Sequence, residues 1–176
     1  IQNGISVLSI DFSGHGESSG DIKQSSLAKR VNEAKIATEL FAAPTGLTIC
    51  GSSMGGYVAL KMLEYFNVKN LVLMAPAIYS RRALDVRFDS GFTEIIREPG
   101  SWQDSDVLEL LEKFTGNLLI VIGQNDSVIP AGVVDLLDQH SQRAAKKEII
   151  YIPGFDHAIH TWIKEVRITK VIIIEI

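Results

Sequence analysis

The sequence predicts an α/β fold, a three-layer α/β/α sandwich in which a mainly parallel sheet lies between layers of helices. Short apolar runs, often β-branched, alternate along the 176-residue chain with segments whose apolar positions recur at helical spacing. Strands that are apolar throughout are typical of parallel sheets covered by helices on both faces. No repeat, low-complexity tract or linker divides the chain, so we expect one domain over residues 1–176.

The predicted strands are continuous apolar runs bounded by turn residues. They are residues 5–12, 47–50, 70–77, 117–123 and 148–153. The predicted helices carry apolar side chains at steps of three and four. They are residues 26–43, 57–66, 106–114 and 131–140. Ser25 or Ser26 can cap the first helix, and Asp106 with Glu109 forms a capping pattern at the start of the third.

Two segments fit the alternation less simply. Residues 78–101 are polar and rich in arginine and aspartate. From residue 158 onward the first half of the tail could be helical, whereas the β-branched residues 171–174 would suit a strand.

Composition narrows the class of protein. The 17 basic and 21 acidic side chains give a net charge of −4, which disfavours a nucleic-acid partner. The single cysteine, Cys50, cannot form an internal disulfide. Apolar runs such as residues 171–174 fall far short of the roughly 18–20 residues of a membrane helix. The first residues resemble no signal peptide. We therefore expect a globular, cytoplasmic protein without a membrane partner.

The strongest local motif is the G-x-S-x-G sequence at residues 51–55, between a predicted strand and a predicted helix. Such a sharp turn holds its central residue in a strained conformation, and the flanking glycines remove Cβ atoms that would collide. The turn would lift the Ser53 hydroxyl off the sheet. The Met54 amide, at the N-terminus of the next helix, would then face a developing oxyanion. The alternative is that Ser53 is only a small residue in a tight turn.

A serine nucleophile needs a base and a group that orients the base. Asp126 follows the predicted strand 117–123, and His157 follows the predicted strand 148–153. With Ser53, both would lie at the carboxyl ends of parallel strands, where open α/β sheets bind ligands. The alternatives for these positions are Asp135, Asp138 and His160, of which both aspartates fall within a helical pattern.

The order Ser, Asp, His at strand ends resembles the α/β-hydrolase family, and four motifs carry the resemblance. Residues 11–18 (DFSGHGES) look like the family's D-x-x-G-H-G-x-S turn, and residues 51–56 look like its nucleophile elbow. NDSVIP, at residues 125–130, is similar to its acid turn, and GFDH, at residues 154–157, to its histidine loop. The resemblance implies that Ser53 is the nucleophile, His157 the general base and acid, and Asp126 the carboxylate that orients it.

The resemblance also implies where the chain departs from the family. Family members carry a third strand ahead of the segment that opens this chain, and the loop after it donates a second oxyanion amide. We therefore expect the N-terminal strands of the fold to be missing from residues 1–176 and the natural protein to be longer. Residues of about 78–105 occupy the place of the family's lid, and their shortness implies little or no cap.

Further residues have two readings each. The resemblance implies that His15 is a packing or hydrogen-bonding residue near the site, with a direct catalytic role as the alternative, and His15 and Tyr57 join Met54 as candidates for oxyanion or substrate binding. Tyr57 could line an acyl pocket or pack in the core, as could Tyr79, Phe92 and Trp102. The arginines of residues 78–101 could receive an anion, but the interleaved acidic residues favour a solvated, self-paired surface.

The sequence contains no phosphate-binding G-K-[ST] loop and no metal-binding motif, so we expect neither a cofactor nor a metal. The first hypothesis is a serine hydrolase that cleaves a small carboxylic ester or thioester through an acyl-enzyme. The alternative is a catalytically weak hydrolase-like domain that binds a ligand or partner, because the upstream oxyanion loop is missing. The expected partner is a small molecule, and a homo-oligomer is left open.

Overall fold

The computed structural model describes residues 7–41 and 46–158. Within them, four parallel strands form one sheet in the order β1-β2-β3-β4. The strands are β1 (Leu47–Ser52), β2 (Val68–Met74), β3 (Asn117–Gly123) and β4 (Lys146–Ile152). The α-helices are α1 (Leu27–Leu40), α2 (Met54–Lys61), α3 (Phe92–Arg97), α4 (Val107–Leu111) and α5 (Ala131–His140). The α/β class with a parallel sheet is confirmed.

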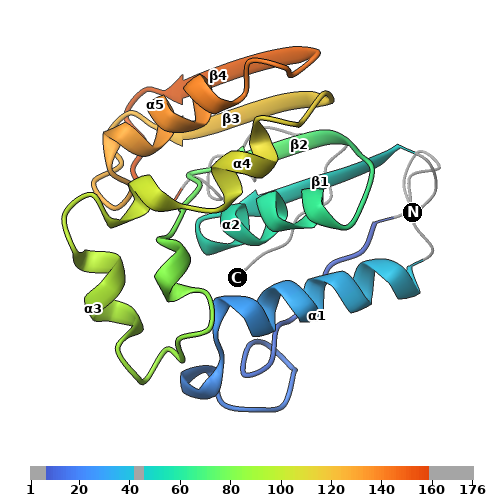
Figure 1. The fold of residues 1–176 in the computed structure, drawn as a ribbon, viewed down its shortest axis with the longest axis vertical. Coiled ribbons are helices and arrows are strands. Elements are labelled where there is room, and N and C mark those ends of the chain that lie inside the picture. The colour runs from blue at the N-terminus through green and yellow to red at the C-terminus, as the bar shows by residue number, and fades with distance from the viewer. Residues whose placement is uncertain (1–6, 42–45, 159–176) are drawn as a thin grey trace.

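The core lies between the sheet and the helices that cover its near face. Figure 1 shows α2, α4 and α5 in front of the strands. Helix α1 lies beside α2, at the β1 end of the sheet. Leu71, Leu73 and Ile120 of the central strands are fully buried. In α2, every residue after Met54 is buried, which fits a helix packed against the sheet as well as against α1 and α4. No described helix has the length and apolar character needed to cross a membrane.

The predicted strand at residues 5–12 is wrong for the part that the structure describes, residues 7–12. Exposure there alternates as in an extended chain, from Val7 at 53% to Phe12 at 1%. However, β1 pairs only with β2 among the described strands, and residues 7–12 pair with none. Leu8 and Ile10 instead line an apolar pocket with residues of β1 and α1. Period-two patterning predicts an extended backbone, but a strand also requires a hydrogen-bonded neighbour.

Helix boundaries differ from the sequence pattern mainly where capping decides them. Ser26, and not Ser25, caps α1, because its side chain accepts a hydrogen bond from the amide of Lys29. The second helix begins at Met54, directly after Ser53, and not at residue 57. Asp106 makes no capping bond to α4, so the predicted capping pattern is wrong. The predicted helix at 131–140 matches α5.

Residues 78–105, called the lid segment below, connect β2 to α4. They contain α3 and two short 3-10 helices, Arg81–Ala83 and Ser101–Asp104. The predicted self-pairing is present, since Arg82 pairs with Glu98, and Arg87 pairs with Asp89 at 2.7 Å. The predictions for the tail, including a strand at 171–174, and the alternative base His160 lie outside the described residues.

Candidate active site

The turn between β1 and α2 holds Ser53 in a conformation that few non-glycine residues adopt, with φ 50° and ψ −119°. A glycine at position 51 makes the turn possible. A Cβ atom there would lie 2.1 Å from the carbonyl oxygen of Gly55 and 2.8 Å from Cβ of Ala59. The motif glycine is therefore required for close packing of helix against strand, as the sequence predicted.

Loops after β1, β3 and β4 bring Ser53, Asp126 and His157 together. His157 Nε2 lies 3.0 Å from Ser53 Oγ, and His157 Nδ1 lies 2.9 Å from Asp126 Oδ2. Because an ionised carboxylate can only accept, the bond to Asp126 favours the tautomer with hydrogen on Nδ1. Nε2 is then free to accept the Ser53 hydroxyl proton. The geometry is that of a nucleophile, a base and an orienting acid.

Asp126 is itself held in place. Its side chain is 1% exposed, and its Oδ1 accepts hydrogen bonds from the amides of Val128 (2.8 Å) and Ile129 (3.0 Å). One carboxylate oxygen therefore fixes the loop, while the other orients His157. His157 is 27% exposed, so a ligand can approach the imidazole from solvent. The two amides were not anticipated from the sequence, although the turn D-x-x-I-P after a strand is a usable signal for them.

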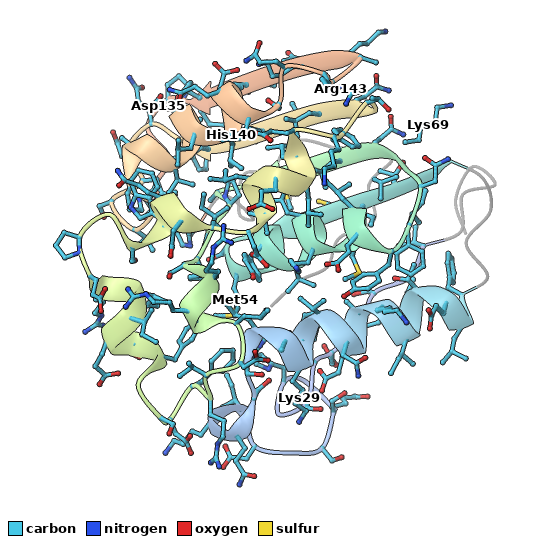
Figure 2. All side chains as sticks on the ribbon, viewed as in Figure 1. Lys29, Met54, Lys69, Asp135, His140 and Arg143 are labelled. Carbon is cyan, nitrogen blue, oxygen red and sulfur yellow. The ribbon has the colours of Figure 1, made fainter. Side chains whose placement is uncertain are left out.

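Met54 begins α2, and Figure 2 labels its side chain at the start of that helix. The first amides of an α-helix have no intrahelical acceptor, and the helix dipole adds partial positive charge there. The Met54 amide therefore lies where it could stabilise negative charge beside Ser53.

Tyr57 and His15 lie in other surroundings than the trio of Ser53, Asp126 and His157. Tyr57 is fully buried, and its hydroxyl donates to Asp106 Oδ1 at 2.9 Å. Burial, reinforced by the charge of Asp106, raises the pKa of Tyr57, so the phenol stays protonated. This placement favours the core-packing reading over an acyl pocket. The His15 ring contacts Nη2 of Arg30 at 3.3 Å, and no described hydrogen bond joins it to the trio.

The first part of the chain matches a known protein family. The family model of serine aminopeptidase, S33, matches residues 1–97, more than half of the chain. The chain belongs to the S33 serine aminopeptidase family. No curated protein matches the sequence significantly.

Solved structures share the fold of this S33 family member. Est1E from Butyrivibrio proteoclasticus, solved with ferulic acid, is 22% identical with a TM-score of 0.64, over 89% of this chain and 74% of that one. A monoacylglycerol lipase from Paleococcus ferrophilus is 18% identical with a TM-score of 0.63, over 88% and 77%. The esterase EaEST from Exiguobacterium antarcticum is 19% identical with a TM-score of 0.63, over 88% and 75%. These likenesses confirm the α/β-hydrolase fold.

Asp106 of this S33 chain binds two side chains of α2, whereas the sequence predicts it as a helix cap. Beyond Tyr57, it binds Lys61 Nζ at 3.0 Å, and Lys61 also pairs with Glu64 at 3.0 Å. Burial lowers the pKa of Lys61, but the bonds to Asp106 and Glu64 raise it further than burial lowers it, so the ammonium stays charged. This network links helix α2 to the start of α4.

The Cys50 thiol of the S33 chain is less suited than Ser53 to act as a nucleophile. Cys50, in β1, is fully buried, and burial raises the pKa of its thiol to about 12, so it is not a thiolate nucleophile near neutral pH. Among residues 7–41 and 46–158, no three His, Cys, Asp or Glu side chains gather as metal ligands would.

Proposed function

We propose that this chain is a serine hydrolase that cleaves a small carboxylic ester or thioester through an acyl-enzyme. The observation that carries the proposal is the pair of hydrogen bonds that joins Ser53 Oγ, His157 and Asp126 at 3.0 and 2.9 Å. These distances lie within the reach that proton transfer between nucleophile and base requires.

In the first half of the reaction, Ser53 Oγ attacks the carbonyl carbon of the substrate as its proton passes to His157 Nε2. The Met54 amide stabilises the oxyanion, and Asp126 stabilises the imidazolium. His157 then returns the proton to the leaving alkoxide or thiolate as the bond between carbonyl carbon and leaving group breaks. The acyl group remains on Ser53.

In the second half, water replaces the leaving group. His157 accepts a proton from the water as its oxygen attacks the acyl carbon, and a second tetrahedral oxyanion forms beside Met54. Its collapse releases the carboxylic acid and returns the proton to Ser53 Oγ. No group outside the chain, the substrate and water takes part.

The choice of ester over amide rests on two of the named structures that share the fold, an esterase and a monoacylglycerol lipase. The family description names an aminopeptidase, so the amide is the competing substrate class. The short lid segment, whose arginines pair with neighbouring acids, supports an open site for a small substrate. The net charge of −4 disfavours a nucleic-acid partner, and we propose a small-molecule partner and a cytoplasmic protein without a membrane partner.

Turnover of a substrate panel tests the proposal. Short-chain p-nitrophenyl esters, the matching thioesters and an aminoacyl p-nitroanilide are compared on the parent chain, with Ser53→Ala as the inactive variant. Ser52→Ala is the matched control, because Ser52 is the neighbouring serine of the same motif and ends β1. We expect ester turnover that Ser52→Ala retains and Ser53→Ala loses.

The pH dependence is the second readout. Because the imidazole must be neutral to accept the Ser53 proton, the rate should rise with pH and then level off. A flat profile contradicts a histidine base, and faster anilide than ester turnover contradicts the proposed substrate class. Saturable ester binding by the folded chain without turnover would favour the alternative of a hydrolase-like binding domain.

A further inference from the structure

Two non-glycine residues among those described have a left-handed φ, Ser53 at 50° and Ala75 at 43°. Each directly follows one of two paired parallel strands, Ser53 after β1 and Ala75 after β2. Side chains other than glycine seldom adopt this conformation, and it persists only where surrounding contacts impose it. The strain at Ser53 belongs to the nucleophile turn, whereas the strain at Ala75 has no role in the mechanism described above.

Residues 74–77, called the 74–77 turn below, comprise the last residue of β2 and the turn that follows it, and they bond to the backbone of Ser53 on both sides. The Ser53 amide donates to the carbonyl of Met74 at 3.0 Å, and the amide of Ala77 donates to the carbonyl of Ser53 at 2.9 Å. The Ser53 carbonyl also accepts from the amide of Gly56 at 2.9 Å, so the amide of Ser53 bonds to residues 74–77 and its carbonyl bonds to both that turn and α2. Ala75, in the middle of the 74–77 turn, sets the spacing between its two bonding partners.

The 74–77 turn is anchored on its other sides. The Ala75 amide donates to the carbonyl of Val121 in β3, the strand that leads to Asp126, at 2.7 Å. Pro76 packs on α2 so closely that a Cβ atom at Gly56 would lie 2.8 Å from Pro76 Cβ. The turn thus links the strand of the nucleophile, the nucleophile helix and the strand of the acid.

We propose that Ala75 is a positioning residue: its left-handed backbone fixes the 74–77 turn, which sets Ser53 Oγ relative to His157. The inference rests on the proposed function, in which Ser53 is the nucleophile. Ala75 is fully buried and acts through Ser53, without touching the substrate. Glycine at position 75 accepts the same φ, whereas a β-branched residue strongly resists it.

The test compares Ala75→Gly and Ala75→Val with the parent chain. The control is Val68→Ala, which removes buried volume at the amino end of the same strand, away from the site. The first readout is the rate constant of labelling by a fluorophosphonate, corrected for the folded fraction. The second is hydrogen exchange of the Ser53 and Ala77 amides, which needs no catalysis.

We expect Ala75→Val to slow labelling by up to about 100-fold, the effect of a displacement of roughly 1 Å at a reacting group. Exchange at Ser53 and Ala77 should accelerate in the same variant, beyond the change in the rest of β2. Ala75→Gly should keep most of the parental rate, and Val68→Ala should lower the melting temperature and label normally.

Parental labelling in Ala75→Val, or equal slowing in Val68→Ala, overturns the inference. If the parent chain itself fails to label, the proposed function is wrong, and amide exchange decides the inference alone. Faster exchange confined to Ser53 and Ala77 in Ala75→Val supports it. Unchanged exchange, or acceleration spread evenly along β2, overturns it.

Discussion

The nucleophile turn and the lid segment both follow strands of the same parallel sheet, yet they are held by different forces. Ser53 is fixed by backbone hydrogen bonds from the turn after β2 and by the buried helix α2. The lid segment carries its ion pairs on arginines that are 54% exposed, such as Arg82 and Arg87. Exposed pairs contribute little to stability, whereas buried backbone contacts tolerate little change. The backbone is therefore held more rigidly at the ends of β1 and β2 than in the lid segment.

The largest effect is expected at the acid that orients the base. Asp126→Asn keeps the size of the side chain and the oxygen that binds the amides of Val128 and Ile129. An amide, however, does not hold His157 in the required tautomer or stabilise its charged form. The rate of ester hydrolysis should fall by about 10⁴-fold, as for the same replacement in another serine enzyme.

The control for this change is Asp135→Asn, on the exposed face of α5 and labelled in Figure 2. It should leave the rate unchanged, and both variants should melt close to the parent. An Asp126→Asn enzyme that keeps most of its activity would show that another group orients His157.

The next largest effect is a loss of stability at the nucleophile turn. Gly51→Ala places a methyl group 2.1 Å from the Gly55 carbonyl oxygen, so strand and helix must separate. We expect a loss above about 4 kcal/mol in the free energy of unfolding, measured by denaturant titration. The matched change in the lid segment is Gly91→Ala, where a Cβ would meet nothing within 4 Å although φ is 95°.

Gly91→Ala should cost only about 1 kcal/mol, the effect of a strained φ without a clash. Similar losses in both variants would contradict the difference between the two regions.

A smaller loss of stability is expected at Asp106, which binds two side chains of α2. Asp106→Ala leaves the Tyr57 hydroxyl and the Lys61 ammonium without their shared acceptor, and both groups are buried. The free energy of unfolding should fall by about 2–3 kcal/mol, which is typical when one partner of a buried polar network is removed. The exposed Asp85, in the lid segment, provides the comparison. Asp85→Ala should change stability by less than about 0.5 kcal/mol, and equal losses would refute the buried network.

The smallest stability change is expected in the lid segment itself. Arg87→Ala removes the ion pair with Asp89, whose side chains are 54% and 33% exposed. Thermal melts at low and high salt should differ from the parent by less than about 0.5 kcal/mol. A loss comparable to that of Asp106→Ala would mean that the lid pairs stabilise the fold after all.

Much of the candidate site could be predicted because it depends on local sequence. Glycines beside Ser53 are needed by any sharp strand-to-helix turn, and Asp126 and His157 follow apolar runs that end at one edge of the sheet. The parallel sheet followed from the same runs. These features require only neighbouring residues and the alternation of elements.

The errors share a different cause, which is dependence on partners distant in sequence. Residues 7–12 have the alternation of a strand but no ladder, because pairing is decided by what lies beside them. Asp106 looks like a helix cap, yet it turns toward Tyr57 and Lys61, about 45–49 residues away. The left-handed Ala75 lies inside a run that reads as an uninterrupted strand. No local pattern encodes these contacts.

The most direct test of the account is covalent labelling of the chain by a fluorophosphonate, followed by intact mass and peptide mapping, with Ser53→Ala alongside. We expect one adduct per chain, mapped to Ser53 and absent from Ser53→Ala, because His157 lies 3.0 Å from the Ser53 hydroxyl and activates it. A folded parent chain that stays unlabelled, or that labels equally in Ser53→Ala, would contradict the assignment of Ser53, His157 and Asp126 as the catalytic residues.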